Sequence, residues 1–116
     1  MARNLRPEKM STAVLLRRKT ALFSTLRVPT DLVRASYVRQ YLTCGKKGCR
    51  CHKGQKHGPF HYLVQCVRTG MIRKFLLKTD GQKQKAHASV TAYTEFQQQL
   101  EELSQINTEL LRRGAL

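Results

Sequence analysis

Three of the four cysteines in this 116-residue chain fall within eight positions, at Cys44, Cys49 and Cys51, and His57 follows six residues later. The segment between Cys44 and His57 is rich in glycine and lysine and has no large apolar side chain. Such a loop cannot be ordered by a core of its own. Three thiolates and one imidazole fill the tetrahedral coordination of Zn²⁺, whose binding energy then folds the loop. The sequence therefore predicts a zinc knuckle with these four residues as ligands.

The fourth ligand is less constrained by the spacing than the three cysteines are. His52, His61 and Cys66 are alternatives to His57. Because His52 directly follows Cys51, the two would ligate with no spacer between them, which is geometrically awkward. His61 and Cys66 lie in a strand-like run, where ordinary half-buried side chains are common. We expect His57 to be the ligand, and an unligated flexible loop remains the competing interpretation.

The charge of the chain points to a polyanionic partner. There are 22 Lys and Arg against 7 Asp and Glu, for a net charge of +15, and residues 1–85 hold 20 of the basic residues but only three of the acidic ones. Nucleic acid is the commonest partner for such an excess, and we expect DNA rather than RNA. The expected nucleic-acid contacts are Arg17, Arg18, Lys19, Arg39, Lys46, Lys47, Arg50, Lys53 and Lys56.

Arg50 is the first choice among these for a base-edge or minor-groove contact, because it lies between two expected zinc ligands and would be held rigidly. Four aromatic residues flank the knuckle, and they either stack on unpaired bases or pack the sheet. These residues are Tyr37, Tyr41, Phe60 and Tyr62.

The pattern of apolar residues predicts an α+β fold in a single small domain over residues 7–116, preceded by a basic tail at residues 1–6. Apolar residues at helical spacing after Pro7 predict an N-terminal helix over residues 7–26. The run from residue 32 to 78 predicts a three-stranded antiparallel sheet with the knuckle between the first two strands. Thr69 and Gly70 fit a two-residue hairpin loop. If Arg68 opposes Met71, Tyr62 opposes Leu77.

A long helix is predicted over residues 82–113, with Thr79 or Asp80 as its N-cap and Gly114 at its end. Its apolar residues recur at a mean spacing close to that of coiled coils. A helix of ~30 residues is longer than a small sheet needs, so it is a candidate for self-association or for a protein partner, and the alternative is that the core of its own chain uses the whole helix. The residues expected to make this contact are Phe96, Leu100, Leu103, Ile106 and Leu110.

The chain resembles a family of small uncharacterised bacterial and archaeal proteins commonly encoded in or near transposable elements. The resembling segments are Ser36–Tyr41, the Cys44-Gly45-x-x-Gly48-Cys49-x-Cys51 motif, His57–Leu63 and Leu103–Leu111. The resemblance implies that the three cysteines and the histidine before Gly-Pro act together, which supports His57. The family commonly has an aromatic residue where this chain has His61, so the resemblance argues against His61 as a ligand. It also implies an association with mobile DNA.

Taken together, these patterns predict a zinc-stabilised, non-catalytic nucleic-acid-binding subunit of a mobile-element or other nucleoprotein complex. The alternative is a protein-interaction adaptor or inhibitor that acts through the C-terminal helix and a basic face. Catalysis is not expected, since there is no nucleophile elbow and no Gly-rich phosphate loop. No apolar run approaches ~18 residues, so no membrane span is predicted. We expect a cytoplasmic protein, because the apolar run at residues 13–16 is too short for a signal peptide.

Overall fold

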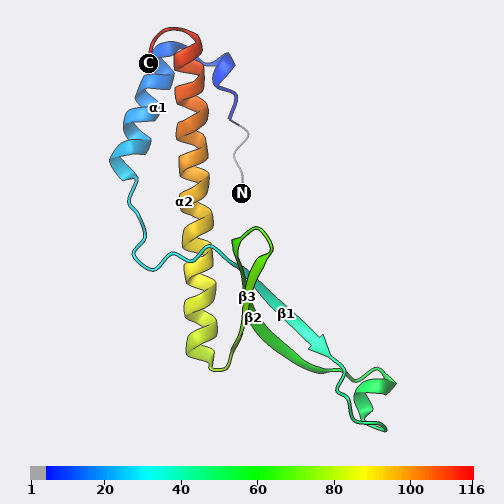
Figure 1. The fold of residues 1–116 in the computed structure, drawn as a ribbon. Coiled ribbons are helices and arrows are strands. Elements are labelled where there is room, and N and C mark those ends of the chain that lie inside the picture. Colours follow the sequence, from blue (N-terminus) through cyan, green and yellow to red (C-terminus); the bar gives the residue numbers. More distant parts are fainter. Residues whose placement is uncertain (1–4) are drawn as a thin grey trace. The chain divides into compact units, whose positions relative to one another are not determined.

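The computed structural model describes residues 5–116, so residues 1–4 of the predicted basic tail lie outside it. The described residues form two α-helices, two 3-10 helices and three strands, and Figure 1 shows how the chain passes through them. This confirms the predicted α+β fold, with an N-terminal helix, a three-stranded antiparallel sheet, cysteines between the first two strands and a long final helix. In chain order the elements are η1 (Pro7–Lys9), α1 (Thr12–Thr25), β1 (Ser36–Leu42), η2 (Arg50–Lys53), β2 (His57–Arg68), β3 (Met71–Leu77) and α2 (Asp80–Arg112).

The predicted helix over residues 7–26 is wrong in its first part. Only a short 3-10 helix forms at Pro7–Lys9, and Met10 is extended at φ −98° and ψ 147°. Ser11 then caps α1, since its side chain accepts a hydrogen bond from the Val14 N–H at 3.2 Å. Serine bonded in this way favours the start of a helix over its interior, so α1 begins at Thr12.

The sheet has the order β1-β2-β3 and both pairings are antiparallel. Arg68 opposes Met71, as predicted. A register shift between Cys66 and Arg68 then moves the rest of the ladder by one residue, so Tyr62 opposes Leu76 instead of Leu77. An extra residue on one strand is a β-bulge, and it reverses which side chains share a face.

The chain divides into two compact units, residues 31–91 and residues 1–30 with 92–116. α2 contributes its first part to one unit and its second part to the other. The prediction of a single domain over residues 7–116 stays a prediction, because compactness does not measure folding cooperativity.

The unit of residues 31–91 has a small core between the sheet and the start of α2. Leu63, Leu77 and Ala86 are buried together, and Tyr37 and Val90 pack against them. The start of α2 is fixed by Thr79, whose hydroxyl accepts the Gln82 N–H at 3.1 Å. This confirms Thr79 as a capping residue for the long helix.

The other unit is a pairing of α1 with the second part of α2. Leu15, Ile106 and Leu110 are fully buried in it, and Leu5 and Met10 pack against them. Each such leucine or isoleucine contributes about 1.5–3 kcal/mol by leaving water. Among the described residues, no helix is long and apolar enough to cross a membrane.

Candidate metal centre

The register of the β1–β2 hairpin places the first and last residues of the cluster side by side. Leu42 at the end of β1 opposes His57 at the start of β2, and Cys44 follows two residues after Leu42. The backbones of the two strands approach each other closely here, since a Cβ on Gly58 would lie 2.8 Å from the carbonyl oxygen of Gln40. Gly58 has a φ of +129° and precedes a cis peptide bond to Pro59. Glycine is therefore required where the two strands meet the knuckle.

The middle of the knuckle is a chain of turns that brings Cys49 and Cys51 together. Cys49 precedes η2, and its carbonyl accepts the His52 N–H at 3.1 Å. Gly54 ends η2 in the left-handed conformation, with a φ of +97°. These turns are local, so no apolar core is needed to form them.

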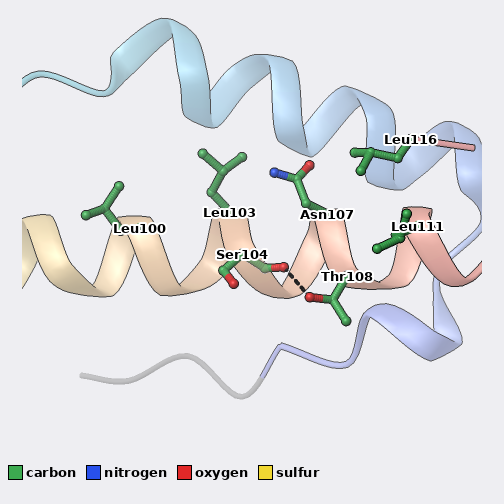
Figure 2. A pocket seen from close by; sticks show the side chains of 7 residues that line it. All are labelled: Leu100, Leu103, Ser104, Asn107, Thr108, Leu111 and Leu116. Carbon is green, nitrogen blue, oxygen red and sulfur yellow. Dashed lines mark hydrogen bonds between the residues drawn. The ribbon is translucent and has the colours of Figure 1, made fainter.

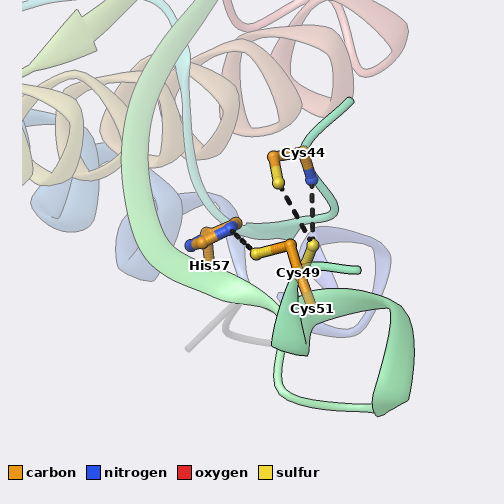
Figure 3. Close-up of side chains that lie close together, drawn as sticks. All are labelled: Cys44, Cys49, Cys51 and His57. Carbon is orange, nitrogen blue, oxygen red and sulfur yellow. Dashed lines mark hydrogen bonds between the residues drawn. The ribbon is translucent and has the colours of Figure 1, made fainter. Parts of the chain in front are cut away.

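The side chains of Cys44, Cys49, Cys51 and His57 converge, as Figure 3 shows, with all four ligand atoms within 4.8 Å of one another. The sulfurs of Cys44 and Cys51 are 3.4 Å apart, and Cys49 Sγ lies 3.3 Å from His57 Nε2. A tetrahedral Zn²⁺ with bonds of about 2.3 Å to sulfur holds its sulfurs about 3.8 Å apart. The four atoms thus have the spacing and the chemistry to hold one metal ion of this size.

Hydrogen bonds within the cluster favour thiolate at one position. The pKa of Cys49 is lowered to about 6, chiefly by a backbone hydrogen bond from Cys51 and further by its thiol and imidazole neighbours. For Cys44, a backbone hydrogen bond from Lys46 lowers the pKa, but the thiols of Cys49 and Cys51 together with burial raise it by more, so the pKa of Cys44 is raised overall. Thiolate is the form that binds metal, so the cluster presents a ligand near neutral pH.

The three alternatives for the fourth ligand lie outside this cluster in the described part of the chain. His61 Nδ1 is 2.6 Å from the Tyr37 hydroxyl, and burial lowers the pKa of His61, assisted by the charges of Lys83 and Arg39. Cys66 is exposed and donates to the Arg68 carbonyl. His52 is exposed on η2. The structure therefore brings His57, and none of its rivals, to the three cysteines.

The cations expected to contact nucleic acid fall in both compact units. Six belong to the unit of residues 31–91, namely Arg39, Lys46, Lys47, Arg50, Lys53 and Lys56. The other three, Arg17, Arg18 and Lys19, lie on α1. Arg18 donates to Glu102 at 2.9 Å, so part of its charge is neutralised within the protein.

Two of the four aromatic residues near the knuckle are engaged by the protein itself. Tyr37 packs against the core, with the ring of His87 5.9 Å from its own. Lys74 Nζ lies 4.3 Å over the ring of Tyr62. Tyr41 is 50% exposed. Packing therefore accounts for Tyr37, whose partner His87 gave no signal in the sequence beyond its place near the start of a helix.

The five residues expected to contact a protein partner are divided between core and surface. Ile106 and Leu110 are fully buried against Leu15, so their side chains are used by the core of their own chain. Phe96 and Leu103 are half-buried, and Leu100 is exposed. Asn107 was not predicted from the sequence, although it stands at heptad spacing from Leu100 and lines a groove with it.

The fold and the cluster define a small α+β protein with a Cys₃His set that could hold a metal ion. Residues 13–81, more than half of the chain, match the family described as Domain of unknown function (DUF6788), so the chain belongs to this family. The matched region includes the three strands, nearly all of α1 and all four clustered residues. No curated protein and no solved structure gave a match.

Proposed function

We propose that the protein is a zinc-stabilised nucleic-acid-binding subunit, with DNA as the preferred partner, that serves a mobile-element or other nucleoprotein complex without catalysing a reaction. The proposal rests on one observation: the four side chains that could hold a metal ion lie in a loop rich in Lys and Arg. Lys46, Lys47 and Arg50 lie among the clustered cysteines, and Lys53 and Lys56 follow before His57.

Zinc is the metal that suits the cluster best. Three thiolates and an imidazole are the ligands of structural zinc sites, and four protein ligands leave no open position for water or substrate. The metal would therefore act as a structural cross-link, with Cys44 and His57 joining the two strands and Cys49 and Cys51 holding η2. This supports a non-catalytic role.

The distribution of charge supports a polyanion as the partner of this unit. Residues 31–91 contain 13 of the 22 Lys and Arg but only two of the seven acidic residues, Asp31 and Asp80. Cations held on a loop that metal has already ordered lose less entropy on binding phosphates. Arg50 begins η2 between two clustered cysteines, so bound zinc would hold it more rigidly than the other cations of the loop. The resemblance to proteins encoded near transposable elements supports DNA.

The test is a salt titration of binding to duplex DNA, single-stranded DNA and structured RNA with the zinc-loaded protein. The variant changes Lys46, Lys47 and Arg50 to glutamine. Its control changes Arg68, Lys78 and Lys85 to glutamine, which are exposed in the same unit and lower the net charge equally. The knuckle variant should flatten the salt slope by about 0.9 for each phosphate that it no longer neutralises, and the control should change the slope less.

Equal behaviour of the two variants would show that only net charge matters and would overturn the knuckle as the contact. A parent protein that binds none of the three nucleic acids near physiological salt would favour the alternative, a protein-interaction adaptor. The observation that favours this second candidate is an apolar groove along α2, lined by Leu100, Leu103 and Leu111 among others.

A further inference from the structure

One face of the sheet takes no part in the buried core. Side chains alternate between the two faces along a strand, and directly opposed residues of neighbouring strands share a face. Leu63 and Leu77 therefore lie on one face, where Ala86 of α2 packs against them. The opposite face, the Phe60 face, consists of the even-numbered residues in the segments 36–40, 60–66 and 72–76, and none of these is buried.

The Phe60 face combines apolar side chains with one cation. Leu76 and Ile72 are 37% and 68% exposed, and Phe60 and Tyr62 are half-buried. Lys74 is the only charged residue of this face, which contains no Asp or Glu. A surface of this composition suits a ligand that has flat apolar parts and carries negative charge.

Two aromatic rings follow each other along the central strand of this face. Phe60 and Tyr62 are separated by a single residue of β2, so their side chains are neighbours on the same face. Sheets that bind single-stranded nucleic acid use aromatic residues on neighbouring positions in this way, with successive bases stacked on the rings.

Lys74 holds the place of a ligand on one of the two rings. Its ammonium lies 4.3 Å from the centre of the Tyr62 ring and bonds Gln40 Oε1 at 3.1 Å. An exposed cation over a ring is held more weakly than a base that is stacked on one. A base can therefore replace the ammonium on Tyr62, and the freed cation then pairs with a phosphate.

Phe60 also forms a wall of a hollow beside the metal cluster. The hollow has a volume of about 430 Å³, which is within the range of small-molecule sites. Thr43 and Lys46 line it, together with three of the clustered residues, Cys44, Cys49 and His57. A nucleotide whose base lies on Phe60 thus has a hydroxyl and a cation of the knuckle within the same hollow.

The charge of this unit argues against a second copy of the chain as the occupant. Residues 31–91 contain 13 Lys and Arg against two acidic residues, which leaves a net charge of +11. Two such units packed together at this face would repel each other. Single-stranded DNA instead supplies bases for the rings and phosphates for the cations.

We propose that the Phe60 face binds single-stranded DNA, with one unpaired base stacked on Phe60 and the next on Tyr62. The inference rests on the proposed function and specifies the form of the DNA and the residues that hold its bases. The cations of the knuckle neutralise phosphates of either form, whereas the two rings select DNA whose bases are not already stacked in a duplex.

The test compares two strands of equal length and charge, an oligothymidylate and an abasic strand, as ligands of the zinc-loaded protein. The parent should bind the oligothymidylate at least about tenfold more tightly, because only this strand has bases to stack. Phe60→Leu and Tyr62→Leu should each reduce this preference. Neither should change the salt slope, since leucine removes the ring but no charge.

Two control variants remove exposed apolar groups from other surfaces. Phe75→Leu lies in the same sheet but on the opposite face, where Phe75 opposes Leu63 and is 54% exposed. Leu111→Ala lies in the other unit, in the groove of α2 that Figure 2 shows. Both controls should keep the preference of the parent, and circular dichroism checks that every variant is folded.

Equal affinity of the parent for the two strands would overturn base stacking but leave DNA binding through the cations intact. A parent that binds no nucleic acid would overturn the proposed function and this inference together. A loss in the Phe75 variant equal to that in the Phe60 variant would show that the Phe60 face is not the contact. Tighter binding of oligouridylate, lost in the same variants, would assign this face to RNA and contradict the choice of DNA.

Photo-crosslinking locates the contact in the unaltered protein, so that it does not depend on how the variants fold. A strand with 5-iododeoxyuridine in place of thymidine should become attached to Phe60 or Tyr62, as mass spectrometry of the peptides will show. Attachment confined to peptides outside β2 would contradict the proposal.

Discussion

Cys51 is the buried member of the Cys44, Cys49, Cys51 and His57 cluster. It is 2% exposed, and its sulfur accepts the Cys44 backbone N–H at 3.2 Å while lying 3.4 Å from Cys44 Sγ. Cys66, by contrast, is exposed and outside the cluster. Loss of Cys51 should therefore reduce metal binding far more than loss of Cys66.

Cys51→Ser should reduce the bound zinc from about one per chain to near zero, because a neutral hydroxyl is a poor ligand for this metal. Cys66→Ser should leave the zinc content unchanged. Elemental analysis of the purified proteins after gel filtration measures both. Full zinc in the Cys51 variant would show that the metal sits elsewhere.

Glu109 is a buried carboxylate in the unit formed by α1 and the second part of α2. It is 8% exposed and accepts hydrogen bonds from Arg112 and Arg113. These bonds, those from Arg112 foremost, lower the pKa of Glu109 to about 2 from an ordinary value of 4.5. Since the folded state favours the ionised form, its stabilisation is complete above the ordinary pKa and is lost as the pH falls towards about 2.

Glu109→Gln should therefore lower the melting temperature at pH 7 and have little effect at pH about 2, where the parent carboxyl is itself becoming protonated. Thermal melts of the zinc-free proteins measure this, so that loss of metal in acid does not enter the comparison. An equal decrease at both pH values would mean that the packing of the side chain, and not its charge, stabilises the helices.

At this scale, the sequence was sufficient to predict the cluster but not the groove. The spacing of Cys44, Cys49 and Cys51 restricts a metal site strongly, because thiolates at such intervals have few other uses in a glycine-rich loop. His57 emerged among four candidates. Asn107 was not singled out in the sequence, because whether its side chain lies in the core or on the surface depends on which side of α2 is covered by α1. Periodicity alone does not decide that.

Among the elements, the β1–β2 hairpin has a very close approach of two backbones. A Cβ on Gly58 would lie within 3.3 Å of three backbone atoms, including Gln40 O and Phe60 N. Gly70, in the β2–β3 turn, also has a positive φ of +78° but has nothing within 4 Å of its Cβ position. The two glycines thus share a conformational requirement but differ in steric surroundings.

Gly58→Ala should destabilise the protein by more than about 1 kcal/mol, because strain at positive φ adds to a clash with backbone that cannot turn aside. It should also weaken zinc binding, since His57 precedes it. Gly70→Ala should show the strain alone and leave zinc binding unchanged. Urea unfolding and competition with a chelator measure the two effects. Equal zinc affinities in both variants would count against the hairpin as the element that positions His57.

The types of the elements followed from the sequence, whereas their irregularities did not. Alternating apolar residues predicted the strands, but the extra residue near Val67 shifted the register and set Tyr62 against Leu76. Bulges arise from strand twist and packing, which short-range patterns do not record. Likewise, the cap at Ser11 interrupted a continuous apolar spacing that favoured one helix.

For the molecule as a whole, the metal cluster and most of the cations fall in the same compact unit, residues 31–91. The other unit holds its own core of Leu15, Ile106 and Leu110. Since the cores do not share side chains, metal loss should act locally.

Chelation of zinc should therefore increase hydrogen exchange in residues 43–56 far more than in residues 100–110 of α2. Peptide-resolved exchange by mass spectrometry provides this comparison. A uniform increase along the chain would show that the metal supports both units as one cooperative domain, which is the single domain that the sequence predicted.

The measurement that bears most directly on the metal-stabilised knuckle is X-ray absorption at the zinc edge of purified, zinc-loaded protein, together with its metal content. We predict about one zinc per chain, with three sulfur neighbours at about 2.3 Å and one nitrogen at about 2.0 Å. Less than about half a zinc per chain, or a shell of oxygen and nitrogen without sulfur, would contradict a site formed by Cys44, Cys49, Cys51 and His57.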